Sequence, residues 1–140
     1  MGLDTSHNCW HGPYGAFTRW RNVVAKAAGY SVWTVKGTDG YENETVMLDW
    51  GHLDIKNPDH LNGEWVTPPS DPLVVLIAHQ DCEGVIHPEH AGPLADRLEA
   101  LLPSIPNAVF GLYGNPREKT EQFIRGLREA VSKGEDVDFH

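Results

Sequence analysis

Leu73-Val74-Val75-Leu76-Ile77-Ala78 is the clearest continuous apolar run in this chain of 140 residues. A short run of this kind, rich in β-branched residues, is typical of a strand that is buried on both faces. We therefore expect it at the centre of a sheet. The polar loop His79-Gln80-Asp81-Cys82-Glu83-Gly84 follows directly, and open α/β sheets place their ligands at the carboxyl ends of strands.

On either side of this run, apolar residues recur at three- and four-residue spacing and predict three amphipathic helices. The residues that start or stop them are turn formers and helix caps. The expected helices, with these residues, are 14–28 (Gly29), 88–102 (Pro88 and Pro103), and a last helix from Pro116 to just before Gly134, with Asn115 as its N-cap.

Further strands are predicted where β-branched and aromatic residues gather, at 30–36, 45–50, 108–113 and 137–139. The expected fold is an α/β or α+β domain over 1–140, with a single-layer sheet of about four strands packed with about three helices. Many turn formers make 37–70 an irregular insertion or surface loop.

The composition limits the classes of partner. With 11 Lys and Arg against 20 Asp and Glu, the formal net charge is -9, which disfavours nonspecific nucleic-acid binding. We expect no export signal and no membrane span, because no stretch approaches the ~20 apolar residues of a spanning helix. Two cysteines are too few for a disulfide scaffold, so a cytoplasmic location is expected. A small anionic ligand or a protein partner fits this charge, and the oligomeric state is left open.

Two segments carry candidate metal ligands of the mixed nitrogen and sulfur type that zinc prefers. We expect zinc to be held by residues from both segments, namely His7, Cys9, His11, His79 and Cys82. The spacing matches neither CxxC nor HExxH. A structural alternative exists for each segment, because the first could be a capped N-terminal turn and the second could cap the following helix through Asp81 and Glu83.

If zinc kept one position for water, metal-assisted hydrolysis of a small anionic substrate would follow. His79, Asp81 and Glu83 are the candidate catalytic residues. The candidate substrate-binding residues are Asp4, Arg19 and Arg21, of which the arginines would receive the anion. A metal-free alternative uses Cys82 as the nucleophile and His79 as its base.

Three separated motifs together resemble a family of small uncharacterised bacterial and phage proteins. The motifs are an N-terminal GLDTxHxCWHG from Gly2, a central HxDCEG from His79 and a C-terminal VxFH from Val137. The resemblance implies that the three segments form one unit, either a shared pocket or a shared fold nucleus around Trp10 and Phe139. It implies no activity.

A second class of function competes with the metal site. A noncatalytic interaction module would use the acidic surface and the tryptophans in and beside the irregular middle, Trp33, Trp50 and Trp65, against a protein partner. An enzyme should bring the polar residues together in one accessible cluster. An interaction module should instead show an exposed aromatic patch and scattered histidines.

Overall fold

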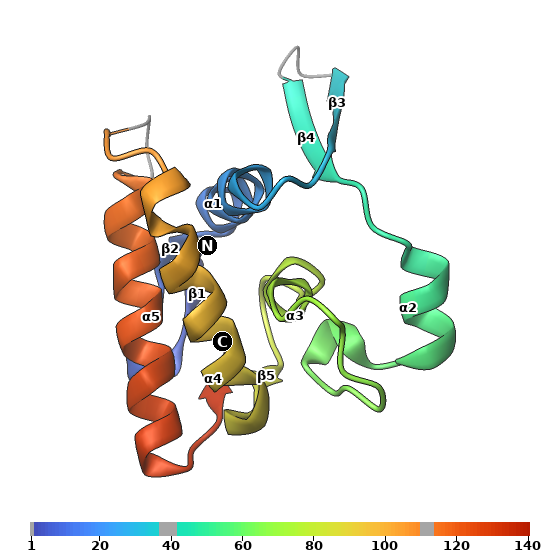
Figure 1. Ribbon diagram of the computed structural model, residues 1–140, viewed down its shortest axis with the longest axis vertical. Coiled ribbons are helices and arrows are strands. Elements are labelled where there is room, and N and C mark those ends of the chain that lie inside the picture. Colours follow the sequence, from blue (N-terminus) through green and yellow to red (C-terminus); the bar gives the residue numbers. More distant parts are fainter. Residues whose placement is uncertain (1, 37–41, 110–113) are drawn as a thin grey trace.

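The computed structural model describes residues 2–36, 42–109 and 114–140 (Figure 1). Its elements, in chain order, are β1 (Gly2–Asp4), the 3-10 turn η1 (Ser6–Asn8), β2 (His11–Pro13), α1 (Tyr14–Ala27), β3 (Val32–Lys36), β4 (Glu42–Val46), α2 (Trp50–Lys56), η2 (His60–Asn62), α3 (Leu73–Ile77), β5 (Val85–Ile86), α4 (Pro88–Leu101), η3 (Leu102–Ser104), α5 (Pro116–Lys133) and β6 (Val137–Asp138). No helix within these ranges has the length and apolar character needed to cross a bilayer.

Helices α1, α4 and α5 build most of the core. α4 and α5 lie side by side and run in opposite directions (Figure 1). Their apolar stripes meet, as the spacing predicts, and α1 adds Phe17 and Trp20, both fully buried. The ring of Trp20 lies 5.0 Å from that of Phe123 on α5, and the Trp20 indole donates to Thr120 Oγ1 at 3.0 Å. The three long helices predicted from the sequence are confirmed.

Helix α5 begins and ends where its capping residues predict. The side chain of Asn115 accepts hydrogen bonds from the backbone N–H groups of Arg117 and Glu118. Gly134 ends the helix with a positive φ of 65°, a conformation that glycine adopts without a Cβ penalty.

The described strands form antiparallel pairs, β1 with β2, β3 with β4 and β5 with β6. Together with the helices they confirm the mixed helix-and-strand class. They differ in arrangement from the expected single sheet, because each pair packs on a different part of the helical core. The strands predicted at 30–36 and 137–139 correspond to β3 and β6.

The apolar run 73–78 is not a strand, and this prediction was wrong. Leu73–Ile77 form the short helix α3, in which every residue is buried. Asp71 Oδ1 accepts from the backbone N–H of Leu73 at 3.0 Å and so supports its first turn. A run that is apolar on all sides fits a buried helix as well as a buried strand, and tertiary packing decides between them.

Other expectations in the middle of the chain also change. β4 lies at Glu42–Val46 and α2 begins at Trp50, so the strand predicted at 45–50 is displaced towards the N-terminus. The irregular region 37–70 therefore contains β4, α2 and η2, while 37–41 lies outside the described residues. Of the strand predicted at 108–113, residues 108 and 109 are not in a strand and 110–113 lie outside the described part.

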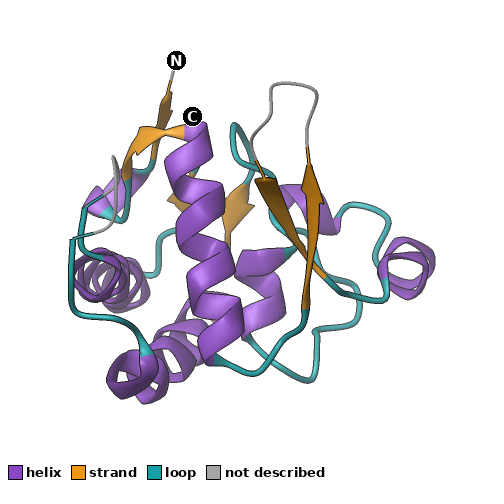
Figure 2. Ribbon diagram, turned by 90° about the horizontal axis from the view of Figure 1, so that it is seen from above, coloured by secondary structure: helices purple, strands orange, loops and turns teal. Residues whose placement is uncertain are grey.

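The two chain ends meet beside the loop that follows α3. Asp4 and His140 exchange backbone hydrogen bonds, of 3.3 Å from Asp4 N and 2.8 Å from His140 N. Phe139 N donates to Gly84 O at 2.9 Å, and Phe139 is bridged to Thr5. Figure 2 shows the strand nearest the N-terminus, β1, beside the C-terminus, as these hydrogen bonds require. The three motif segments of the sequence thus lie in one place.

Candidate functional site

His79 lies at this junction and is buried. Its ring stacks on Phe139 with centroids 4.1 Å apart. Nδ1 lies 2.7 Å from Gln80 O and Nε2 lies 2.9 Å from Val85 O. Burial lowers the pKa of His79, and the two carbonyls oppose that shift without cancelling it. Both ring nitrogens face backbone carbonyls, and the neutral ring donates its one N–H to either of them. His79 therefore holds the loop between α3 and β5 by contacts with the backbone.

The two cysteines have different surroundings. Cys9 is fully buried against α5, next to Gly126, and burial raises the pKa of its thiol to about 12. Cys82 is exposed in the loop after α3, with Sγ 3.2 Å from Gln80 Oε1. Both thiols are free. Cys9 is therefore a core residue, and Cys82 is the accessible thiol.

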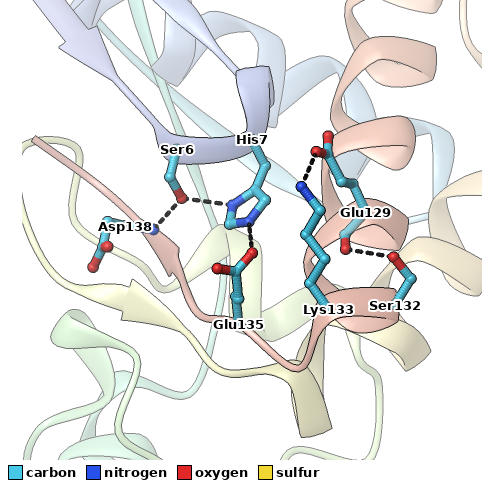
Figure 3. Close-up of polar contacts among 7 residues, drawn as sticks. All are labelled: Ser6, His7, Glu129, Ser132, Lys133, Glu135 and Asp138. Carbon is cyan, nitrogen blue, oxygen red and sulfur yellow. Dashed lines mark hydrogen bonds and ion pairs between the residues drawn. The ribbon is translucent and has the colours of Figure 1, made fainter.

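The N-terminal histidines point to separate partners. His11 Nδ1 contacts Asp4 Oδ1, and both side chains are largely exposed. His7 lies in η1 with only 11% of its side chain exposed, and its Nε2 is 3.1 Å from Glu135 Oε1. His7 also contacts Ser6 on its other nitrogen (Figure 3). The sequence did not single out Ser6 or Glu135.

Within the described ranges, no group of three or more His, Cys, Asp or Glu side chains is arranged to hold a metal ion. Of the five candidate zinc ligands, His79 faces two backbone carbonyls, Cys9 faces α5 and His11 is paired with Asp4. The candidate catalytic carboxylates Asp81 and Glu83 lie in the same loop as Cys82, and Glu83 is exposed. The zinc site stays a prediction from the sequence.

The side chain of Arg21 contacts an aromatic ring and several backbone carbonyls of the protein itself. Its guanidinium lies 4.5 Å from the centroid of the Phe17 ring and donates to the carbonyls of Leu76, Ile77 and His79. Burial lowers the pKa of Arg21 to about 10, although the negative charge of Asp81 acts to raise it. Arg21 thus satisfies carbonyls at the carboxyl end of α3, whereas Arg19 on the same helix is exposed.

His87 bridges two segments that are distant in the sequence. Its Nδ1 lies 2.7 Å from Asp136 Oδ1, and its Nε2 lies 2.7 Å from Glu64 Oε1. Burial favours the neutral ring, but the two carboxylates outweigh it and raise the pKa of His87. Neither partner lies near His87 along the chain, so the spacing of the sequence gives no signal for this bridge.

Away from the junction of the chain ends, an apolar surface lies on and beside the hairpin of β3 and β4. We call it the hairpin face and define it by Trp33, Val35, Met47 and Trp50, which are 60%, 52%, 51% and 38% exposed. These residues, together with Thr45, Val46 and Leu48, line a hollow of about 320 Å³. The hairpin projects away from the helical core in Figure 1. This surface fits the exposed aromatic patch expected of an interaction module.

No protein-family model, curated protein or solved structure matches this chain.

Proposed function

We propose that this protein is a protein-interaction module that binds its partner through the hairpin face. The observation that carries the proposal is a two-stranded sheet with apolar side chains on both of its faces. One face is covered by the protein itself, and the other is open.

The register of the hairpin explains this division. Val32 pairs with Val46, and Trp33 pairs with Thr45. Because successive side chains of a strand point to opposite faces, Val32 and Val46 share one face and Trp33 and Thr45 share the other.

The Val46 face packs on α1. Val46 is 5% exposed, Asn22 Nδ2 donates to Glu44 O at 3.0 Å, and Lys26 Nζ lies 2.7 Å from Glu44 Oε1. The opposite face, with Trp33 and Val35, has no such cover among the described residues. A two-stranded sheet is only marginally stable in water unless its apolar face is packed, and exposed apolar patches of this kind are typical of interaction surfaces.

The edges of the hairpin suggest how a partner binds. Within the described part of the chain, β3 and β4 pair only with each other. On the outer edge of β4, the backbone carbonyl of Glu44 already accepts a hydrogen bond from Asn22. The outer edge of β3 is therefore the more accessible of the two edges. An extended segment can add to such an edge by backbone hydrogen bonds and place every second side chain on the face beside it.

The net charge of this protein indicates which side chains the bound segment should carry. The chain carries a formal net charge of -9, so its field favours a cationic partner and disfavours an acidic one. The proposed partner is therefore an extended protein segment with apolar side chains at alternate positions and Lys or Arg between them. Trp33 is the expected anchor of the interface, since tryptophan is enriched among residues that dominate binding energy.

A displayed library of random peptides, selected on the purified protein, tests this proposal. We expect the selected peptides to share alternating apolar and basic residues. Trp33→Ser should weaken their binding at least about tenfold, which corresponds to ~1.4 kcal/mol.

Ile55→Ser is the matched control, because Ile55 is an exposed apolar residue of α2 that does not line the hollow. This substitution should leave the affinity unchanged. Selected peptides that are acidic, or that bind the Trp33→Ser variant as tightly as the original protein, would contradict the proposal.

A further inference from the structure

Ser6, His7 and Glu135 form a chain of hydrogen bonds where the N-terminal turn meets the end of α5 (Figure 3). Ser6 Oγ lies 2.8 Å from His7 Nδ1, and His7 Nε2 lies 3.1 Å from Glu135 Oε1. The backbone N–H of Asp138 donates to Ser6 Oγ at 2.8 Å. A hydroxyl, an imidazole and a carboxylate from distant parts of the chain are thus joined in series.

The directions of these hydrogen bonds follow from the groups present. The ionised carboxylate of Glu135 only accepts, so His7 Nε2 carries the ring proton. His7 Nδ1 is then free to accept from the Ser6 hydroxyl. This is the order of nucleophile, base and orienting acid found in hydrolytic triads. The two ring nitrogens have the opposite roles from those in the best-known examples.

The turn that holds these groups has a strained backbone. His7 and Asn8 both have a positive φ, of 58° and 54°, which is uncommon for residues other than glycine. Contacts with α5 hold this conformation. Gln122 Nε2 donates to Asn8 O at 3.0 Å, and a Cβ at Gly126 would come within 2.8 Å of His7 O. Strained residues fixed by their surroundings are concentrated at functional sites.

We propose that Ser6 is an acyl-accepting nucleophile that acts on small esters, with His7 as its general base and Glu135 as the positioning residue. Ser6 is half-buried, and the hydrogen bond that its hydroxyl accepts from Asp138 N is exposed. The carboxylates of Glu135 and Asp138 give the site negative charge, which favours an uncharged or cationic acyl group over an anionic one. This chemistry is independent of binding at the hairpin face.

In the reaction, Ser6 Oγ forms a bond to the carbonyl carbon of the ester while its proton passes to His7 Nδ1. Glu135 stabilises the imidazolium ion that results. The carbon–oxygen bond to the alcohol then breaks, and His7 returns the proton to the departing alkoxide. Water repeats the sequence on the acyl-serine and releases the carboxylic acid. Ester and water are thus the reactants, and acid and alcohol are the products.

A fluorophosphonate probe tests the nucleophile directly, because Ser6 Oγ would displace fluoride from phosphorus and retain the phosphonyl group. Peptide mapping of the full chain after labelling should place the adduct on Ser6. His7→Asn should slow labelling by on the order of a hundredfold, as expected for loss of a general base. Asparagine suits this variant because it tolerates the positive φ at this position.

Ser132 provides the matched control, since it is an exposed serine of α5 whose hydroxyl donates to Glu129 O (Figure 3). Ser132→Ala should leave labelling unchanged. Two results would overturn the proposal: labelling of Ser6 no faster than of Ser132, or equal labelling at Ser6 in a folded His7→Asn variant.

Discussion

At the scale of single residues, the structure separates groups that the sequence placed together. Cys9 and Cys82 illustrate this difference. The thiolate is the reactive form of cysteine, and burial raises the pKa of Cys9 to about 12, whereas Cys82 is exposed. Brief treatment with N-ethylmaleimide at neutral pH should therefore give an adduct on Cys82 only, as mass spectrometry can verify. Comparable labelling of Cys9 in the folded protein would contradict its burial.

Arg21 gives a second prediction at this scale. Its guanidinium donates to Leu76 O at 3.3 Å, to Ile77 O at 3.5 Å and to His79 O. Arg21→Met would leave these carbonyls without a donor, which should lower the free energy of unfolding by about 3 kcal/mol. Arg19→Met, at an exposed position on the same helix, should change it by less than ~0.5 kcal/mol. Urea denaturation compares the two variants, and similar losses would rule out this role for Arg21.

The sequence identified several residues at the junction of the chain ends but not their contacts. His7, Cys9 and His79 were selected for their chemical type. Their neighbours depend on backbone geometry that spacing does not show, such as the positive φ of His7 and the placement of Glu135 beside it. Local spacing therefore could not indicate that Cys9 is a core residue.

At the scale of the elements, prediction succeeded where the signals are local. Asn115, Pro116 and Gly134 cap α5 by contacts within a few residues, and these were read correctly from the sequence. The run from Leu73 carries no such signal, because a helix and a strand buried on all sides have the same apolar composition. In the folded protein, Asp71 accepts a hydrogen bond from Leu73 N at one end of α3, and Arg21 donates to Leu76 O at the other.

The contact between η1 and α5 can be tested with two glycines that both lie inside helices. A Cβ at Gly126 would clash with Cys9 Sγ and come within 2.8 Å of His7 O, whereas one at Gly92 would meet only Val131 Cγ2 at 3.9 Å. Gly126→Ala should destabilise the protein by roughly 1–3 kcal/mol. Gly92→Ala should be neutral or stabilise it by up to about 1 kcal/mol, as expected for alanine in a helix. Thermal unfolding distinguishes these outcomes, and a neutral Gly126→Ala would contradict the close contact.

His87 joins η2 and β6 through Glu64 and Asp136, which flank those elements. Because these carboxylates raise its pKa in the folded state, its contribution to stability is fully present below the unfolded value of ~6.5. That contribution is lost as the pH rises through the raised pKa.

The variant His87→Gln isolates this effect. His79 and His90 have lowered pKa values and so act in the opposite direction, with stability lost in acid. The difference in melting temperature between the original protein and His87→Gln should therefore be largest below ~pH 6.5 and shrink above it. A difference that is constant with pH would contradict the bridging contacts.

At the scale of the whole molecule, the fold separates two regions. The chain ends and the loop from His79 to Gly84 form a densely bonded junction with α5, and the hairpin of β3 and β4 projects from the other side of α1 (Figure 1). The overall acidity and the tryptophans in the irregular middle could be read from the sequence. The presentation of Trp33 and Trp50 around one open hollow could not, because it depends on the pairing of β3 with β4 and on the packing of β4 against α1.

Mapping a bound peptide by nuclear magnetic resonance would show directly whether the hairpin face is the binding surface. A peptide of alternating apolar and basic residues would be titrated into isotope-labelled protein. We predict shifts in the backbone amides of Val32–Lys36 and in the indole signals of Trp33 and Trp50, with α4 and α5 unchanged. Shifts centred on α4 and α5 at saturating peptide, with the β3 amides unmoved, would contradict the claim.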